Sequence, residues 1–570
     1  MMMMGPPCFA PRRGGRSVKN TARLLLAVAA SGLLSLTAIA QVPEIDIPDT
    51  LIARTYREAA VKNVLAAVNP HVFPGYFSVA ADGQKFGFGN TYPSLDGHEM
   101  SDALLWLGSV DVVRKNWEYV KSFQRKDGLL PLAIFPGMAG KDIGPKGLPA
   151  FVAPNGGLYV HWVTGNPLEA LGSPTYIQNA DVIYRMTLDT AWLKLQLPST
   201  DRAADFLASL TSTDGAVRGG GYYVERPPRL DYDGVTQCYA ADAFTRAASL
   251  NRVAGNDSAA SRYDGIAARI RAHFMRDFWV GDHFAEYINP VHGVIANHGL
   301  TDVDWAGIAT GAASREQVRK LWPRLRGEKR FYYGGMPTGI ATHPERYEPW
   351  EFVYDRHDLA AMGRVWYVEA WARARMGDAA GLLAGLRKVA EVGRDSGYYW
   401  HERYEPDGKG GAVATGPLTY CEYPANFIRI VQRFLLGVDL RLDGTIVLAP
   451  TVTPEFWDRG FGETLSWRDR ILRFRLSRDT LSGVYSGRGV QRVGVRFPPA
   501  AAVKSVRASL DGRSVPVRRT GDMYFIAVVP RGDGKACSFT LRRESRSLKR
   551  SPPRALSTTW RDRPIPGAHG

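Results

Sequence analysis

The spacing of apolar residues changes at Gly437, and this change divides the chain into two parts with different folds. Before Gly437, apolar residues recur three and four positions apart, as between Leu104 and Phe123, which is typical of helices with one buried face. The segments predicted to be helical are 51–67, 101–124, 177–195, 203–210, 237–253, 261–278, 315–325, 359–376, 379–392 and 423–436. Successive helical hairpins of this kind can close into a ring whose inner helices surround a cup. We therefore predict a mainly α fold, a toroid of helical hairpins, over residues 41–437.

After Gly437, apolar and polar residues alternate in short runs, such as 471–476 and 524–529, and Asp-Gly turns separate the runs. Alternation with a period of two is typical of strands with one buried face. This pattern predicts a small C-terminal antiparallel β-sandwich over residues 438–544. Residues 545–570 are rich in Arg, Ser and Pro and poor in apolar side chains, and we expect a disordered basic tail there.

The N-terminus is organised like an export signal. A basic stretch ends at Arg23, an apolar run follows from Leu24 to Leu36, and the small residues at 38–40 suit cleavage by a signal peptidase. The apolar run is too short to serve as a membrane span. We predict a signal peptide over residues 1–40, no membrane span in the mature chain, and a periplasmic or secreted location.

The net charge of +16 is a poor indicator of nucleic-acid binding, because most of it lies at the two ends of the chain. Residues 1–40 hold five basic residues and no acid, and residues 541–570 hold eight basic and two acidic residues. The remainder is only mildly basic, so we expect no nucleic-acid partner.

The cysteines give no sign of a metal site or a disulfide framework. Cys238, Cys421 and Cys537 follow the predicted signal and lack C-x-x-C spacing. A bridge between Cys238 and Cys421 and buried free thiols both stay open as interpretations. The histidines are scattered and no phosphate-binding glycine loop occurs, so we expect neither a metal nor another cofactor.

Two clusters of acidic and aromatic residues lie far apart in the sequence, at 225–233 and 399–411. Sugars are bound by stacking on aromatic rings and cleaved by pairs of carboxylates, so two such clusters at the edges of helices suit glycoside hydrolysis. Each cluster also has an ordinary structural interpretation. Asp231 would cap the helix that follows it, although Asp233 is better placed to do so, and Glu402 would form a surface ion pair with Arg403. Glu405 is a local rival for the role of base.

The segment 347–358 is the densest in polar and aromatic residues, and it precedes the helix predicted from residue 359. Glu348 and Glu351 are alternative catalytic acids in this segment. Trp350 and Tyr354 are candidate platforms for a sugar ring, although aromatic residues at such spacing are as often part of a core.

Four segments resemble, in order, the six-hairpin glycosidases, most closely glycoside hydrolase family 63 and the trehalases of family 37. They are 92–99 (YPSLDGHE), 123–131 (FQRKDGLLP), 230–233 (LDYD) and 401–411 (HERYEPDGKGG). The chain departs from the family pattern at Leu95, where these families usually have Trp, and before the third segment, where Pro-Pro-Arg replaces Glu-Ser-Gly. The resemblance implies an (α/α)6 toroid.

The resemblance also implies roles for single residues. Asp231 would be the general acid and Glu402 the general base of an inverting hydrolase that cleaves an α-linked sugar. In such enzymes the two carboxyl groups stand roughly 6.5–9.5 Å apart, which leaves room for the attacking water. Asp96, Gln124 and Trp400 lie in the similar segments and are candidate substrate contacts.

Other functions stay open at this point. The β domain also resembles the C-terminal sandwich of the α-L-rhamnosidases, which are the nearest competitor for substrate. A toroid polysaccharide lyase that acts on a uronic acid, or a carbohydrate-binding protein without activity, would fit the same fold. In each case we expect an oligosaccharide or glycoside as the partner.

Overall fold

The computed structural model describes residues 42–68, 77–81, 95–131, 133–135, 151–152, 158–160, 169–219, 231–351, 359–468, 470–499, 503–530, 532 and 535–545. The predicted signal peptide and residues 546–570 of the predicted tail lie outside this set. Within the described residues, no helix combines the length and the apolar character that crossing a bilayer requires.

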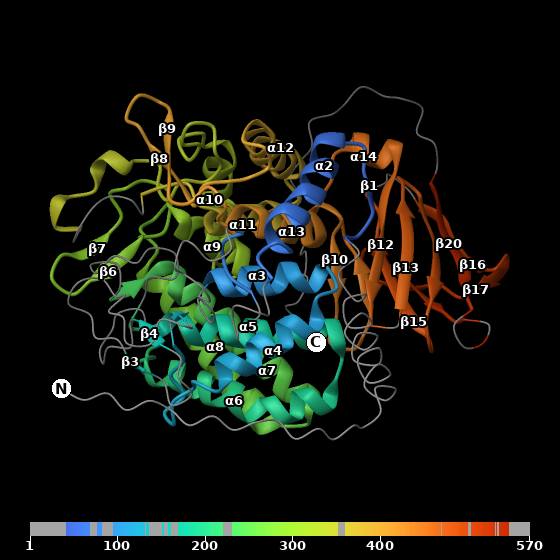
Figure 1. Ribbon diagram of the computed structural model, residues 1–570, viewed down its shortest axis with the longest axis horizontal. Helices are drawn as coiled ribbons and strands as arrows, with labels where there is room; N and C mark the ends of the chain where they lie inside the picture. Colours follow the sequence, from blue (N-terminus) through green and yellow to red (C-terminus); the bar gives the residue numbers. More distant parts are fainter. Residues whose placement is uncertain are drawn as a thin grey trace, which may run out of the picture. The chain divides into compact units, whose positions relative to one another are not determined.

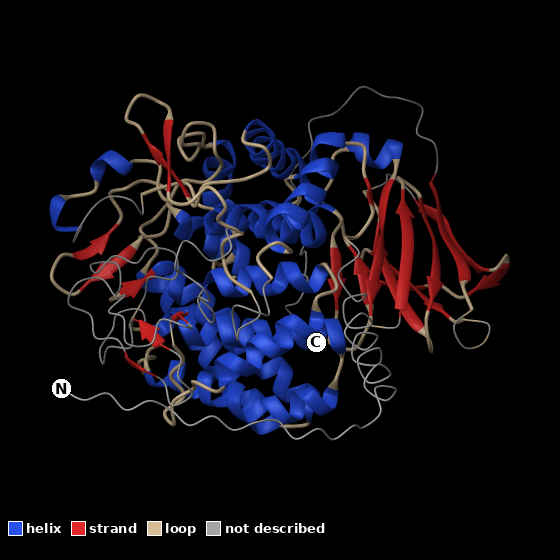
Figure 2. Ribbon diagram, viewed as in Figure 1, coloured by secondary structure: helices blue, strands red, loops and turns tan. Residues whose placement is uncertain are grey.

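The predicted change of pattern at Gly437 is confirmed. Helices fill most of the described chain before this residue, and strands fill most of it afterwards (Figures 1 and 2). The π-helical turn η5 (Val431–Leu435) ends just before it, and strand β10 (Val438–Leu440) begins just after it. Gly437 has a φ of +68°, and a Cβ atom there would lie 2.3 Å from the carbonyl carbon of Ala449, so the turn requires glycine.

Helices make up most of the described chain before Gly437. Their bounds are α2 (Thr50–Glu58, continued by the π-helical η1, Ala59–Val64), α3 (Leu95–Trp106), α4 (Val110–Lys121), α5 (Glu169–Thr187), α6 (Thr190–Ser209), α7 (Gly234–Ala254), α8 (Asp257–Asp277), α9 (Asp302–Thr310), α10 (Arg315–Gly327), α11 (Gly363–Met376), α12 (Ala379–Asp395), α13 (Glu422–Ile430, continued by η5) and α14 (Pro454–Arg459). Two segments predicted as single helices are divided. Gly108, with a φ of +78°, separates α3 from α4, and Leu188, with a φ of +46°, separates α5 from α6.

Among the described residues, six helices contact one another in a cycle. Helix α3 contacts α5, α5 contacts α7, α7 contacts α9, α9 contacts α11, α11 contacts α13, and α13 contacts α3 again. Helices α4, α6, α8, α10 and α12 each contact at least one of these six. The helices of the cycle are buried on most sides, and all nine residues of α9 are buried. Because a helix buried all round shows no apolar period, the sequence did not predict α9.

Backbone bridges join the segments that lead into the helices of this cycle. Strand β5 (Tyr232–Asp233) enters α7 directly and pairs with β6 (Tyr287–Asn289), which continues into β7 (Gly293–Ile295). Isolated bridges link residue 301 with 341 before α9, 361 with 404 before α11, and 80 with 420 before α13. Strand β8 (Arg403–Pro406) pairs with β9 (Ala412–Thr415). The N-terminal ends of these helices are therefore where distant parts of the chain converge.

Three further short strands, β2 (Ala133–Phe135), β3 (Phe151–Val152) and β4 (Leu158–Val160), form a small antiparallel sheet. The larger strands of the C-terminal part are β11 (Ile446–Leu448), β12 (Phe461–Trp467), β13 (Arg470–Leu476), β14 (Thr480–Ser486), β15 (Gln491–Arg496), β16 (Val503–Leu510), β17 (Arg513–Val515), β18 (Arg518–Thr520), β19 (Met523–Val528) and β20 (Cys537–Ser545). One sheet has the order β1-β12-β13-β14-β20-β16-β17, and the other has the order β10-β11-β15-β19-β18.

Two features of these sheets differ from the predicted antiparallel domain. Strands β11 and β15 run parallel to each other, with Ile446 opposite Val493, while the other described pairs of the two sheets are antiparallel. Strand β1 (Ile45–Asp46), from the start of the described chain, pairs with β12. Local alternation predicts a strand but carries no information on which distant strand it pairs with.

Candidate active site

Three carboxylates meet at the N-terminal ends of helices in the cycle. Asp96 and Glu99 lie in the first turns of α3, and Glu422 is the first residue of α13. One oxygen from each of the three lies within 4.8 Å of the others. Arg364, in the first turn of α11, reaches two of them, because its Nη2 donates to Glu422 Oε2 at 2.8 Å and to Asp96 Oδ1 at 3.2 Å. We call these four residues the carboxylate cluster.

Glu99 is the member of the carboxylate cluster whose surroundings most favour the protonated form. It is 1% exposed, and burial, followed by the charges of Glu422 and Asp96, raises the pKa of its carboxyl well above the ordinary value. Glu99 Oε2 has no hydrogen-bond partner among the described residues. Carboxylate oxygens this close are ligands for a hard cation, but the Arg364 guanidinium already supplies positive charge to Glu422 and Asp96. The cluster is therefore suited to hydrogen bonding with hydroxyl groups of a ligand.

The charges of Glu402 and of Asp96, a member of the carboxylate cluster, both act on Tyr420. Burial, followed by the negative charges of Asp96 and Glu402, raises the pKa of the Tyr420 hydroxyl well above its ordinary value, so the phenol keeps its proton. Glu402 pairs with Arg403 Nη2 at 3.0 Å, and both side chains are only 14% exposed. The predicted ion pair with Arg403 thus exists, but it is mostly buried and does not lie on an open surface.

Gly416 makes room for Glu402. Its φ is +74°, and a Cβ atom at this position would lie 2.6 Å from both Cβ and Oε2 of Glu402. Any other residue would push the Glu402 carboxylate aside or strain the backbone. The rival carboxylate Glu405 accepts a hydrogen bond from the Thr415 hydroxyl at 2.8 Å across the β8–β9 pair.

Asp231 lies next to the N-terminal end of α7, one residue before β5. Partial burial raises the pKa of its carboxyl, and Arg218 opposes this shift. The helix cap is Asp233, as predicted, because its Oδ2 accepts hydrogen bonds from the Thr236 backbone N–H at 2.7 Å and from the Thr236 hydroxyl at 2.8 Å. Asp231 is therefore not needed to cap α7.

Trp350 is partly exposed beside the β6–β7 hairpin. Its ring stacks on His292 with centroids 3.7 Å apart, and 37% of the residue is exposed. The hairpin turn that carries His292 is fixed by Asn289, whose Oδ1 accepts hydrogen bonds from the backbone N–H groups of residues 291 and 292. Because β6 pairs with β5, the strand that follows Asp231, this hairpin also connects Trp350 with the neighbourhood of Asp231.

Glu351 belongs to a different, closed cluster. His298 Nδ1 lies 2.6 Å from Glu286 Oε2, and its Nε2 lies 3.3 Å from Glu351 Oε2. Burial alone would lower the pKa of His298, but Glu286 and Glu351 raise it to about 9. Tyr347 stacks on the imidazole at 3.6 Å and donates its hydroxyl to Glu286. We call these four residues the histidine clamp; they leave Glu351 poorly placed to act as a catalytic acid.

Two predicted substrate contacts, Trp400 and Gln124, make other interactions in the structure. Trp400 is completely buried, donates its Nε1–H to the Val389 carbonyl at 3.0 Å and packs against Gly393, so it is a core residue. Gln124 joins α4 to α6, because its amide donates to the carbonyls of residues 128 and 199, and its oxygen accepts from Ser199 and Arg202. Tyr354 lies outside the described residues.

The sequence did not predict that Glu99, Arg364 and Tyr420 take part. Glu99 follows Asp96 by three residues, a spacing that places both on one face of a helix, so this one could have been found. Arg364 and Tyr420 reach the site only through tertiary contacts. Glu422 accepts a hydrogen bond from the Arg364 backbone N–H, and so caps the start of α11 and not that of its own helix. Cys238 and Cys421 are buried free thiols.

No protein-family model matches the sequence, and no curated protein is similar to it. The α-L-rhamnosidase from Dictyoglumus thermophilum has a similar structure, with a TM-score of 0.54 and 11% identity over 88% of this chain and 50% of that chain. The GH78 family rhamnosidase of Bacillus sp. GL1 gives a TM-score of 0.55 and 11% identity over 78% of this chain and 40% of that one. The GH63 mannosylglycerate hydrolase from Thermus thermophilus gives a TM-score of 0.49 and 11% identity over 64% of this chain and 98% of that one.

At these identities the similarity to the two rhamnosidases shows a shared fold and nothing more, and the TM-score of 0.49 supports no argument. The chain spans half or less of the length of the two rhamnosidases. The predicted resemblance to glycosidases with a helical domain and a β domain is thus confirmed at the level of the fold.

Proposed function

We propose that this protein is a glycoside hydrolase that cleaves an α-linked sugar with inversion, in a site at the N-terminal ends of α3, α7, α11 and α13. The observation that supports this most is the meeting of Asp96, Glu99 and Glu422 beside Arg364, with Glu402 near enough for its charge to act on Tyr420 as that of Asp96 does. A site with this many carboxylates and few cations binds hydroxyl-rich neutral ligands by hydrogen bonds and supplies a base.

In this proposal Glu402 is the general base. Arg403 favours the ionised form of Glu402, and the Gly416 backbone leaves its carboxylate room beside Tyr420. The carboxylate takes a proton from a water molecule that attacks the anomeric carbon. Tyr420, which keeps its proton, donates a hydrogen bond to the substrate or to this water.

Asp231 is the general acid of the proposed mechanism. Partial burial raises the pKa of its carboxyl, which favours the protonated form that an acid needs before it donates to the leaving oxygen. Asp231 and Glu402 both adjoin N-terminal ends of helices in the same cycle. An inverting mechanism requires their carboxyl groups to stand roughly 6.5–9.5 Å apart on opposite sides of the sugar.

Asp96, Glu422 and Glu99 hold the hydroxyl groups of the sugar in the proposed site. Asp96 and Glu422 accept hydrogen bonds, whereas the protonated Glu99 and the Arg364 guanidinium donate them. Trp350, stacked on His292, offers a ring face for the part of the substrate beyond the scissile bond, on the side of Asp231.

The proposal also covers the architecture of the enzyme, its location and the class of substrate to test first. The contact cycle supports an (α/α)6 toroid over residues 41–437, followed by a β-sandwich domain over 438–544. The basic and apolar start of the chain supports export to the periplasm or the medium. Because the structures above with a TM-score over 0.5 are called rhamnosidases, α-L-rhamnosides are the first substrates to test.

The test is hydrolysis of a panel of α-glycosides, α-L-rhamnosides and neutral α-linked disaccharides first, followed by NMR of the anomeric proton. The proposal predicts that the sugar released first has the anomeric configuration opposite to that of the substrate. Release with retained configuration would contradict the inverting mechanism. An unsaturated uronic-acid product would indicate a lyase, and binding without turnover across the panel would indicate a carbohydrate-binding protein.

A further inference from the structure

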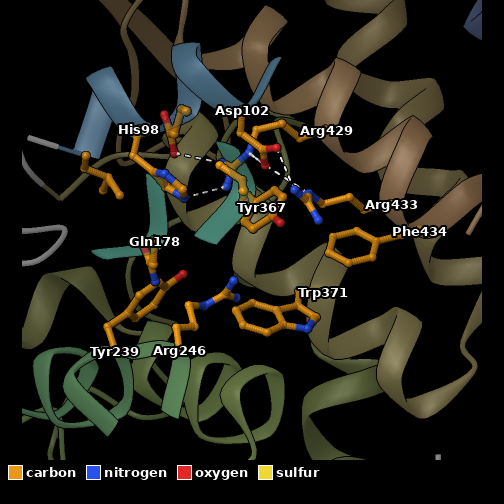
Figure 3. A pocket seen from close by; sticks show the side chains of 13 residues that line it. His98, Asp102, Gln178, Tyr239, Arg246, Tyr367, Trp371, Arg429, Arg433 and Phe434 are labelled. Carbon is orange, nitrogen blue, oxygen red and sulfur yellow. Dashed lines mark hydrogen bonds and ion pairs between the residues drawn. The ribbon is translucent and has the colours of Figure 1, made fainter. Parts of the chain in front are cut away.

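A cavity inside the helix cycle lies apart from the catalytic groups proposed above. Side chains from α3, α5, α7, α11 and α13 with its extension η5 line it, and they include Asp102, Arg246, Tyr367, Arg429 and Arg433 (Figure 3). Trp371 and Phe434 supply apolar wall. The cavity also touches Glu99, and it therefore borders the carboxylate cluster.

Arg433 and Arg246 each have one terminal nitrogen that donates to no carboxylate. Arg433 donates through Nε and Nη2 to Asp102, at 2.9 and 2.6 Å. Arg246 donates through Nε to Asp242 at 2.7 Å and through Nη1 to Asp181 at 2.5 Å. In the part of the chain that the structure describes, Arg433 Nη1 and Arg246 Nη2 donate to no protein atom. The two side chains are 22% and 17% exposed, whereas that of Arg429 is 4% exposed.

The groups that line the cavity carry an excess of positive charge. Burial alone would raise the pKa of Asp102, but the charges of Arg433 and Arg429 hold it far below the ordinary value. This carboxylate is therefore ionised. Burial, followed by the charge of Arg429, lowers the pKa of His98 to about 3, so the imidazole is neutral. Among the lining residues, three guanidinium groups face two carboxyl groups, Asp102 and Glu99, and burial favours the protonated form of Glu99. Asp181 and Asp242 balance Arg246, but they are not among the lining residues, and Arg185 shares Asp181.

Tyr367 lies among these three cations. The Arg429 guanidinium carbon lies over its ring, 3.7 Å from the ring centroid. The charges of Arg429, Arg433 and Arg246 all act on its hydroxyl. In the described residues this hydroxyl makes no hydrogen bond to protein. A phenol donor and two guanidinium donors that face one space are the groups that coordinate an anion.

We propose that this cavity binds a small inorganic anion, held by Arg433 Nη1, Arg246 Nη2 and the Tyr367 hydroxyl. The anion offsets the excess charge around Asp102. Arg429 donates to Asp102, and its Nη1 lies 3.7 Å from Glu99 Oε1. Arg429 therefore connects the anion with the carboxylate cluster. Anion binding concerns the resting protein, so it does not depend on the proposed reaction.

The probe is chloride, compared with gluconate at equal sodium concentration and ionic strength, because gluconate is too bulky for a site made for one small ion. Thermal unfolding of the full chain should show a Tm that rises with chloride and then saturates. Isothermal titration with sodium chloride should give one site per chain. Phosphate in place of chloride tests whether an oxyanion is preferred.

Variants test whether chloride binds in this cavity. Arg433→Gln removes one donor and should weaken chloride binding by about tenfold, the loss expected for one charged hydrogen bond. Tyr367→Phe, which leaves every ion pair intact and keeps the proposal testable if Arg433→Gln does not fold, should weaken it about threefold. Arg441→Gln is the matched control, since Arg441 pairs with Asp439 but does not line the cavity. An equal response to chloride and gluconate in the wild type, or unchanged chloride binding in Tyr367→Phe, would overturn the proposal.

Discussion

The carboxylate cluster and the histidine clamp are both buried groups of ionisable residues close to helix ends, yet they are built for different purposes. In the histidine clamp one imidazole lies between two carboxylates, and the Tyr347 phenol covers it. Both carboxylates accept a further hydrogen bond, Glu286 from the Tyr347 hydroxyl and Glu351 from the Glu348 backbone N–H. In the carboxylate cluster three acids share one guanidinium, and the surplus is relieved by keeping Glu99 protonated. A cluster whose carboxylates are all hydrogen-bonded fixes structure, whereas the carboxylate cluster, in which Glu99 Oε2 has no partner among the described residues, keeps a hydrogen-bonding group for a ligand.

A large effect on catalysis is expected at the proposed acid, Asp231, which belongs to neither cluster. Asp231→Asn should lower kcat by about 10³ for a glycoside with a poor leaving group, the usual contribution of general acid catalysis. The loss should be much smaller for a nitrophenyl glycoside, whose leaving group departs without a proton. Steady-state kinetics on the two substrates measure this difference, and unfolding in urea should show unchanged stability. An equal loss on both substrates would remove Asp231 from the role of acid.

The histidine clamp should respond in stability. His298→Gln leaves Glu286 and Glu351 buried without a cation, and we expect the free energy of unfolding to fall by about 3 kcal/mol at pH 6. Since the pKa of His298 is raised in the folded state, its contribution is complete below about pH 6.5 and is lost as the pH rises through about 9. Urea unfolding at pH 6, 8 and 10 should therefore show the two proteins converging. A constant difference across this range would mean that the charge of His298 is not what stabilises the clamp.

Trp350 tests whether the substrate extends along the β6–β7 hairpin. Trp350→Ala removes a stacking face, and we expect KM for an extended oligosaccharide to rise about tenfold with little change for a small nitrophenyl glycoside. Leu195→Ala, at a more exposed apolar residue of α6, is the control and should leave both KM values unchanged. If KM rises equally for short and long substrates, Trp350 shapes the site and does not bind a distal ring.

The smallest expected effect is at Glu99. Because burial favours the protonated form of Glu99 and its Oε2 has no hydrogen-bond partner among the described residues, Glu99→Gln should change the free energy of unfolding by no more than about 0.5 kcal/mol. Glu422→Gln, in contrast, takes an ionised partner from Arg364 and should cost about 2 kcal/mol. Denaturant titrations of the two variants compare them directly. Equal losses would show that Glu99 is ionised in the folded protein.

The sequence predicted the elements whose pattern is local. The helix at 261–278 matches α8, and the alternating run at 471–476 lies inside β13, because each has one buried face. The helix at 237–253 matches α7, although α7 is buried on most sides. The Asp233 cap was predictable from the same local chemistry. Helix α9 was missed because it is buried on every side, and the break at Leu188 was missed because a positive φ in leucine has no sequence signal.

The site was predictable only in part. Asp96 and Glu402 were found from their motifs, and both adjoin Tyr420. The pairing of Arg364 with Asp96 joins residues 268 positions apart, and no local pattern records such a contact. Trp400 was misassigned because aromatic residues beside a carboxylate have the same spacing whether they face a ligand or the core, and only burial distinguishes them.

The account depends most on Glu402 as the base that activates water. The most direct measurement compares kcat of the wild type, Glu402→Gln and Glu405→Gln on the best substrate of the panel, with urea unfolding of each protein. We predict a loss in kcat of about 10³–10⁴ for Glu402→Gln and less than about fivefold for Glu405→Gln. The free energy of unfolding should fall by about 2 kcal/mol in Glu402→Gln, which loses the ion pair with Arg403, too little to unfold the protein. Turnover close to that of the wild type in Glu402→Gln, or a greater loss in Glu405→Gln, would contradict the account.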